Sequence, residues 1–139
     1  MRRGLQSEPM KRARYLAVGA LLGLLVWRVL GQMDDEIALY LLALFLSATG
    51  AAYAGAALAD RGSRQGPIEV LVFLLMFAAA IAGFANSPGW LAAGYAAHGV
   101  WDVFHHPHRL GAKVVEWFPS VCLSFDLLVA AFILVRFAQ

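Results

Sequence analysis

Residues 68–85 read IEVLVFLLMFAAAIAGFA, a stretch in which Glu69 is the single charged residue. A helix needs about 20 mainly apolar residues to cross the hydrocarbon core of a bilayer, with roughly 17 to 25 tolerated. This stretch therefore predicts a membrane-spanning helix. Four more stretches have the same character and lie near residues 15–30, 37–59, 90–106 and 118–137. We expect an all-α integral membrane bundle of five transmembrane helices, forming one domain over residues 15–139.

The composition of the whole chain also indicates lipid as its solvent. Of its 139 residues, 61% are hydrophobic and only 14% are charged, and the mean hydropathy is +0.68. A soluble domain is about half apolar and about a quarter charged. The single cysteine, Cys122, excludes a disulfide within the chain, and the net charge of +2 gives no reason to expect a nucleic-acid partner.

The basic residues predict how the helices are oriented. They precede the first predicted helix and follow the second and the fourth, at Arg2, Arg3, Lys11, Arg12, Arg14, Arg61, Arg64, Arg109 and Lys113. The loops on the other side hold Asp34, Asp35 and Glu36 but no basic residue. Loops rich in Lys and Arg stay in the cytoplasm. We therefore expect residues 1–14 to form a basic cytoplasmic tail, in a multi-pass protein of a bacterial inner membrane whose first helix is an uncleaved signal anchor.

The second predicted helix is rich in small residues. Gly50 and Ala54 are four residues apart, as are Ala51 and Gly55. Such spacing allows the backbones of neighbouring helices to approach closely in lipid. The pattern favours close packing within one chain, and it also fits a homo-oligomer that associates through this helix. Membrane lipid is the other partner that we expect.

The histidines point to a site inside the bundle. All four lie within residues 98–108, which read HGVWDVFHHPH. On a helix, His98, Asp102, His105 and His106 share one face, because successive residues are turned by about 100°. Ionisable side chains are costly within a membrane, so a functional site is the default hypothesis for them.

The last predicted helix carries matching groups. The loop before it is short, so the fourth and fifth helices are expected to be antiparallel neighbours. At 1.5 Å per residue, His98 and Asp126 both lie roughly 12–13 Å from the cytoplasmic side, and Asp102 is level with Cys122. Glu69 begins its helix on the same side. We expect an intramembrane His/Asp/Cys site near the cytoplasmic leaflet.

These residue types suit a divalent transition metal such as zinc or iron. Imidazole and carboxylate groups bind such ions, and a thiolate adds a softer ligand. The predicted metal ligands are His98, Asp102, His105, His106 and Cys122. Asp126 is expected to orient a ligand or act as a general base, and Glu69 is the second candidate for a catalytic carboxylate. Such a site predicts a metal-dependent enzyme that acts on a lipid or another apolar substrate.

Two other functions use the same polar groups. Chains of His, Asp and Glu inside a bundle can relay protons or ions, as in a carrier. Polar pairs between helices can also be packing elements of a structural or accessory subunit. Few polar groups continue toward the opposite leaflet, which disfavours the carrier. Tyr53 in the second helix is expected either to point its hydroxyl into the bundle or to pack as a ring.

The residues of this site resemble a known family. They are Gly50-Ala51-Ala52-Tyr53, Glu69, His98-Gly99-Val100-Trp101-Asp102-Val103-Phe104-His105-His106, Pro119, Cys122 and Asp126. Together they are similar to a family of small bacterial multi-pass membrane proteins known only as a domain of unknown function. The likeness covers roughly residues 36–131. It implies an integral membrane protein whose polar residues belong together, and it names no activity.

The histidine segment also resembles, in part, the histidine boxes of membrane di-iron desaturases and hydroxylases. Those enzymes hold two irons with more histidines than the four of this chain. Because metal affinity depends on the number of ligands, we expect a single metal ion or a metal-free site instead.

Overall fold

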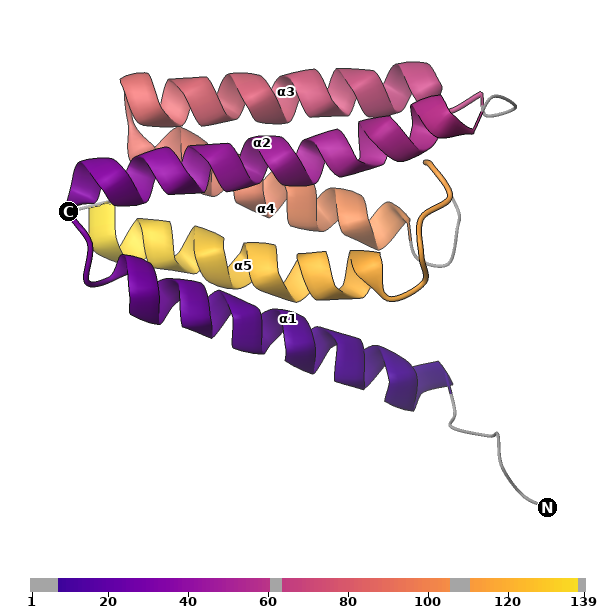
Figure 1. The fold of residues 1–139 in the computed structure, drawn as a ribbon, viewed down its shortest axis with the longest axis horizontal. Coiled ribbons are helices and arrows are strands. Elements are labelled where there is room, and N and C mark those ends of the chain that lie inside the picture. The colour runs from indigo at the N-terminus through magenta and orange to yellow at the C-terminus, as the bar shows by residue number, and fades with distance from the viewer. Residues whose placement is uncertain (1–7, 61–63, 106–110, 138–139) are drawn as a thin grey trace.

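The chain folds into up-and-down α-helices. The structure is a computed structural model that describes residues 8–60, 64–105 and 111–137. Its helices are α1 (Glu8–Leu30), α2 (Asp35–Ala59), α3 (Gly66–Ala85), α4 (Pro88–Phe104) and α5 (Phe118–Phe137). Successive helices run in opposite directions along roughly one axis, with short connections between the first four and a longer one, residues 105–117, before α5 (Figure 1). The predicted all-α fold with five helices is confirmed.

Several helix ends differ from the sequence prediction by two residues or more, and two of these differences involve basic or candidate site residues. Helix α1 begins at Glu8, so Lys11, Arg12 and Arg14 of the predicted tail lie on its first turns. Helix α4 ends at Phe104 and not at residue 106. His106 lies outside the described residues.

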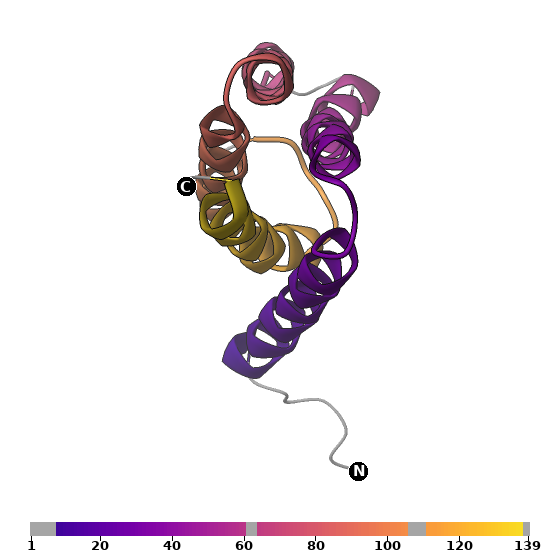
Figure 2. The same cartoon turned by 90° about the vertical axis from the view of Figure 1, so that its left-hand side faces the viewer.

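The helices form an arc when they are viewed along the bundle (Figure 2). Helix α1 packs on α5, α5 on α4, α4 on α3 and α3 on α2, and α2 also contacts α4. We call the end of the bundle at which α1 begins the N-terminal end. We call the opposite end, at which α5 ends, the C-terminal end. Side chains from α2, α4 and α5 meet on the inner side of the arc.

Local sequence signals explain the sharp turn between α3 and α4. Ser87 has an extended backbone, and its hydroxyl accepts a hydrogen bond from the Gly89 N–H at 3.3 Å. Pro88 follows at the first helical position, where its missing N–H costs nothing. The capping serine and the proline together begin a new helix in the opposite direction.

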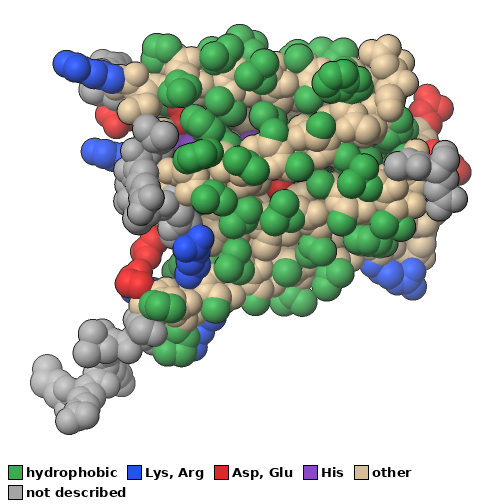
Figure 3. Space-filling view, turned by 180° about the vertical axis from the view of Figure 1, so that it is seen from behind, with side chains coloured by type: hydrophobic (Ala, Val, Ile, Leu, Met, Phe, Trp, Pro, Cys, Tyr) green, Lys and Arg blue, Asp and Glu red, His purple; other side chains and the backbone are tan. Residues whose placement is uncertain are grey.

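Four of the helices, α1, α2, α3 and α5, are long and apolar enough to cross a membrane, as in a multi-pass membrane protein. Helix α4 has 17 residues, which is the lower limit of the usual range. Large hydrophobic side chains are exposed on the outer faces of the helices, for example Leu21 at 66% and Val135 at 60%. Figure 3 shows such side chains along one whole face, with Lys and Arg toward its two ends.

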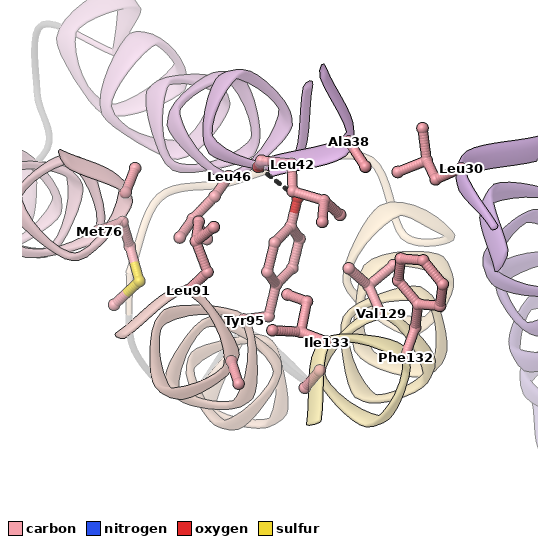
Figure 4. Close-up of a cluster of buried hydrophobic side chains, with 13 residues drawn as sticks. Leu30, Ala38, Leu42, Leu46, Met76, Leu91, Tyr95, Val129, Phe132 and Ile133 are labelled. Atoms are coloured by element: carbon pink, nitrogen blue, oxygen red, sulfur yellow. Dashed lines mark hydrogen bonds between the residues drawn. The ribbon is translucent and has the colours of Figure 1, made fainter. Parts of the chain in front are cut away.

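An apolar core fills the bundle from its middle to the C-terminal end (Figure 4). Leu42 and Leu46 of α2 meet Leu91 and Tyr95 of α4, and Val129 and Ile133 of α5 complete the cluster. The Tyr95 hydroxyl is satisfied there, since it donates to the Leu42 carbonyl oxygen at 2.7 Å. Within the described residues, this core cluster contains no charged side chain.

Arg136 closes the C-terminal end. Its guanidinium pairs with the Asp35 carboxylate at 2.5 Å and donates to the Met33 carbonyl oxygen at 2.6 Å and to that of Leu30. These contacts tie the end of α5 to the connection between α1 and α2. A planar guanidinium suits this role because it offers several N–H donors in one fork.

Glycines bring α1 and α5 together. Gly19 and Gly23 are both buried on the face of α1 that meets α5. The Ser124 hydroxyl of α5 donates to the Leu16 carbonyl oxygen of α1 at 2.8 Å. This contact needs a close backbone approach, because a Cβ atom at Gly19 would overlap the Val121 carbonyl oxygen and the Ser124 hydroxyl.

The small residues of α2 divide between two faces. Gly50 and Ala54 are buried, and Gly50 packs against Met76 of α3. Ala51 and Gly55 are exposed, and nothing lies within 4 Å of the position that a Cβ at Gly55 would take. Close packing within the chain is confirmed for the first face. The homo-oligomer through the second face stays a prediction.

We predict that Gly19→Ala destabilises the bundle whereas Gly55→Ala does not. The added methyl group at Gly19 must push α1 away from α5, and overpacking of this kind costs about 1–3 kcal/mol. The same change at Gly55 meets open space. Thermal unfolding of the two variants in detergent micelles measures the difference. Equal midpoints would contradict the close approach of α1 and α5.

Candidate functional site

Two buried side chains of neighbouring helices pair in the N-terminal half of the bundle. His98 of α4 and Asp126 of α5 are both 0% exposed. The His98 Nδ1 lies 2.6 Å from the Asp126 Oδ2, a hydrogen bond in which the ring N–H donates. The predicted pairing of His98 with Asp126 is confirmed. The other ring nitrogen, Nε2, has no hydrogen-bond partner among the described residues.

A second carboxylate joins this pair. Asp102 lies one helical turn after His98 and is 1% exposed. Its Oδ2 is 3.7 Å from the His98 Nδ1, and its Oδ1 accepts a hydrogen bond from the Tyr53 hydroxyl of α2 at 2.5 Å. Helices α2, α4 and α5 therefore all contribute to one buried polar cluster. We call His98, Asp102 and Asp126 the triad.

Three polar atoms of the triad lack a partner among the described residues. They are the Nε2 of His98, the Oδ2 of Asp102 and the Oδ1 of Asp126. Buried polar atoms are almost always hydrogen-bonded, so each exception requires an explanation. Here the three exceptions belong to the same three side chains, one nitrogen and two oxygens. Each residue of the triad therefore keeps one polar atom that no described residue satisfies.

The triad has the dimensions of a metal site. One ligand atom from each residue can be chosen so that all three lie within 4.8 Å of one another. Zinc bonds to nitrogen and oxygen are about 2.0–2.2 Å long, which separates tetrahedral ligand atoms by roughly 3.5 Å. The spacing of the three side chains is therefore of the order that one ion requires, and the His98 Nδ1 lies 2.6 Å from the Asp126 Oδ2 and 3.7 Å from the Asp102 Oδ2.

Glu69 forms a separate polar cluster closer to the N-terminal end. It is 0% exposed in the first turn of α3. Its Oε1 accepts from the backbone N–H of Ala112 at 2.6 Å and lies 2.9 Å from the His105 Nε2, while its Oε2 accepts from the Trp101 indole N–H at 3.1 Å. We call Glu69, Trp101, His105 and Ala112 the Glu69 cluster. It ties α3 and the end of α4 to the segment before α5.

Both ring nitrogens of His105 have partners. The Nδ1 lies 3.0 Å from the Trp101 carbonyl oxygen, which can only accept, so the Nδ1 N–H donates. The Nε2 lies 2.9 Å from the Glu69 Oε1, which also accepts from the backbone N–H of Ala112. The imidazole is therefore held by α4 on one side and by Glu69 of α3 on the other.

Gly111 completes this cluster. Its φ of +91° is a conformation that residues with side chains rarely adopt. A Cβ at this position would also overlap the imidazole of His105 and the carboxylate of Glu69. The absence of a side chain therefore lets the chain pass directly over these two side chains.

Tyr53 lies between the two clusters. Its ring centroid is 4.2 Å from that of His105 and 5.6 Å from that of His98, and its hydroxyl binds Asp102. The side chain is 1% exposed. Both alternatives from the sequence are thus realised, because the hydroxyl points into the site and the ring packs.

The predicted site residues separate into these two clusters. His98, Asp102 and Asp126 come together, whereas His105 is bound to Glu69 through one ring nitrogen and to a backbone carbonyl through the other. Cys122 is buried one turn before Asp126 and is not part of the triad. Asp126, and not His105, thus lies together with His98 and Asp102. The predicted ligand His106 lies outside the described residues.

Trp101 has a place in the family motif but had no predicted partner, and no pattern in the sequence indicated Gly111 or Ala112 in the site. The Trp101 indole and the Ala112 backbone N–H both bind Glu69. A glycine in the connection between two helices was the available signal for a positive φ. No sequence pattern indicates a backbone donor such as Ala112, because every residue except proline carries one.

The fold and the site define the class of protein. Helices long and apolar enough to cross a membrane surround a buried cluster of ionisable side chains, as in multi-pass membrane proteins with an internal polar site. The chain belongs to the family of unknown function DUF6010, whose model matches residues 14–139. The resemblance to an uncharacterised family is confirmed. Neither a curated protein nor a solved structure matches the chain.

We predict that Glu69→Gln destabilises the protein more than Glu36→Gln. The new amide group must place an N–H where Glu69 now accepts from three donors, so one buried donor loses its acceptor, at a cost of about 1–3 kcal/mol. Glu36 is an exposed carboxylate in the first turn of α2 and serves as the control. Thermal unfolding in detergent compares the two variants. Equal stability would show that the Glu69 cluster does not hold α3, α4 and the connection to α5 together.

Proposed function

We propose that this chain holds one divalent transition-metal ion, zinc or iron, on His98, Asp102 and Asp126. We further propose that it uses this ion as an enzyme on a lipid or another apolar substrate. The observation that carries the proposal is that three fully buried side chains, each with one unpartnered polar atom, bring ligand atoms within 4.8 Å of one another. Membrane lipid would surround the site and supply the substrate.

Charge balance supports a bound cation. Two carboxyl groups and one imidazole are enclosed with almost no exposure. Uncompensated charge is expensive in such surroundings, and buried charges are normally paired or bound to metals. A single histidine offers at most one positive charge to two carboxylates. A divalent ion would neutralise the triad and occupy its free lone pairs.

The ligand set supports catalysis over a purely structural ion. Structural zinc sites are normally closed by four protein ligands, whereas catalytic sites use three and leave one position open. The triad supplies three ligands. An ion at such a site can polarise a carbonyl or phosphoryl oxygen, or lower the pKa of a bound water so that it attacks.

The apolar core argues against a carrier. From the triad toward the C-terminal end, the inner side of the arc is filled by Leu42, Leu46, Tyr95, Val129 and Ile133. The Tyr95 hydroxyl in this region is already bound to a backbone carbonyl. A carrier needs polar groups that continue across the membrane. The polar residues instead gather in the N-terminal half, as expected for a site that opens toward one leaflet.

We also propose that the chain spans a bacterial inner membrane with its N-terminus in the cytoplasm, and that α4 is the fifth spanning helix. The exposed hydrophobic surface, the basic residues before and in the first turns of α1, and those after α2 and α4 support this orientation. The triad and the Glu69 cluster would then lie toward the cytoplasmic leaflet.

Cysteine labelling tests the orientation. The native Cys122 is buried, so a cysteine placed in a loop is the main target for a membrane-impermeant maleimide. We predict that Gln32→Cys, in the connection between α1 and α2, is labelled in intact cells. Lys113→Cys, before α5, should be labelled only after the membrane is permeabilised. The reverse pattern would contradict a cytoplasmic N-terminus.

Metal analysis tests the proposed site. We predict that wild-type protein, loaded with Zn²⁺ or Fe²⁺ in detergent and then desalted, retains about one ion per chain, as a single three-ligand site requires. His98→Ala and Asp126→Asn should each lose it. Asp34→Asn is the matched control, because Asp34 is an exposed carboxylate whose side chain makes no cap hydrogen bond.

Each result distinguishes the alternatives. Retention by the wild type and the control, with loss in both triad variants, supports the proposal. A wild type without stoichiometric metal, whose triad variants lose only stability, would favour the structural subunit. Equal metal in all four proteins would place the ion elsewhere and overturn the triad as its site.

A further inference from the structure

We infer that Tyr53 is a positioning residue of the metal site, which orients Asp102 so that one carboxylate oxygen stays available to the ion. The inference rests on the proposed metal site and adds a residue to it from a third helix. Tyr53 would touch neither the ion nor the substrate, and it would act through Asp102.

The hydrogen bond of Tyr53 divides the roles of the two oxygens of Asp102. The hydroxyl donates to Oδ1 at 2.5 Å, whereas Oδ2 has no hydrogen-bond partner among the described residues and lies 3.7 Å from the His98 Nδ1. A free carboxylate can rotate and exchange its two oxygens. With Oδ1 held by the phenol, the rotation is restricted and Oδ2 faces the other members of the triad.

The ring of Tyr53 is itself held firmly. It packs against His105 at 4.2 Å and Phe118 at 5.5 Å between ring centroids. His105 is fixed in turn by Glu69 and by the Trp101 carbonyl oxygen. The side chain is 1% exposed, so water does not compete for its hydroxyl. His105 of the Glu69 cluster thus fixes the ring of Tyr53 by packing, and the hydroxyl of Tyr53 fixes Asp102 by its hydrogen bond.

The physical reason for such a residue is general. Groups that hydrogen-bond to a metal ligand fix its orientation, and their loss typically lowers metal affinity by about 10- to 100-fold. The effect is strongest when the ligand has no other partner to restrain it. Within the described residues, the Tyr53 hydroxyl is the hydrogen-bond partner that the structure gives Asp102.

The chain contains a matched control for this role. Tyr95 is 0% exposed, like Tyr53 it donates a single hydrogen bond, and it lies in the same bundle. Its partner is the Leu42 carbonyl oxygen in the apolar core and not a member of the triad. Tyr53→Phe and Tyr95→Phe therefore each remove one buried hydroxyl and keep the ring.

Titration of the metal-free protein in detergent with Co²⁺, followed by visible absorption, tests the inference. We expect Tyr53→Phe to weaken binding by about 10- to 100-fold with unchanged stoichiometry and an altered Co²⁺ spectrum. Tyr95→Phe should keep the wild-type affinity and spectrum. Thermal unfolding of both variants checks that any difference in binding does not follow from a difference in stability.

A double-mutant cycle shows whether Tyr53 acts through Asp102. In an Asp102→Glu background, which keeps a carboxylate but moves it out of register with the Tyr53 hydroxyl, Tyr53→Phe should cause no further loss of affinity, because the two residues act as one unit. Equal affinities of Tyr53→Phe, Tyr95→Phe and wild type would overturn the positioning role and leave the metal site intact. A wild type that binds no Co²⁺ would overturn the metal site, and the role of Tyr53 with it.

Discussion

The hydrogen bond between the His98 imidazole and the Asp126 carboxylate is the interaction on which the site depends. It joins α4 to α5 at a depth where both side chains are fully enclosed. A polar group in such surroundings is destabilising unless it is bonded, so the two helices must keep a rotation and a register that bring the pair together. The same constraint positions Asp102, one turn along α4, beside the pair. Each of these three residues keeps one polar atom without a hydrogen-bond partner among the described residues, and these atoms could bind a ligand.

The bundle divides into a polar half and an apolar half, and two tyrosines illustrate the division. Tyr53 and Tyr95 are equally buried, yet one bonds a carboxylate and the other a backbone carbonyl among leucines and valines. In the polar half, the Glu69 cluster lies between the triad and the N-terminal end of the bundle, where it links α3, the end of α4 and the segment before α5. In the apolar half, close side-chain packing leaves polar groups no continuous path. If the proposed ion is bound there, the blocked side would restrict its chemistry to one leaflet.

Two side chains on neighbouring helices can meet only if they lie at the same depth along the bundle and on facing sides of their helices. The sequence prediction was right about depth for one pair and took too little account of it for His105. The rise of a helix correctly placed His98 level with Asp126. His105 shares the face of His98, but seven residues separate the two, which is roughly 10 Å along the axis. One ion cannot bridge that distance, so His105 reaches Glu69 of α3 and not the triad. Asp126, expected to orient a ligand, is close enough to serve as one.

The sequence by itself determined the helices, their apolar outer surface and the short list of residues that carry chemistry. These follow from local properties, namely hydropathy over a span, turn residues between spans and the 3.6-residue period. Only the tertiary structure decided the partners: Tyr53 with Asp102, 49 residues apart, and Glu69 with His105, 36 apart. The rotation of each helix about its own axis depends on packing against distant segments. No local pattern contains that information, and the separation of the triad from the Glu69 cluster follows from it.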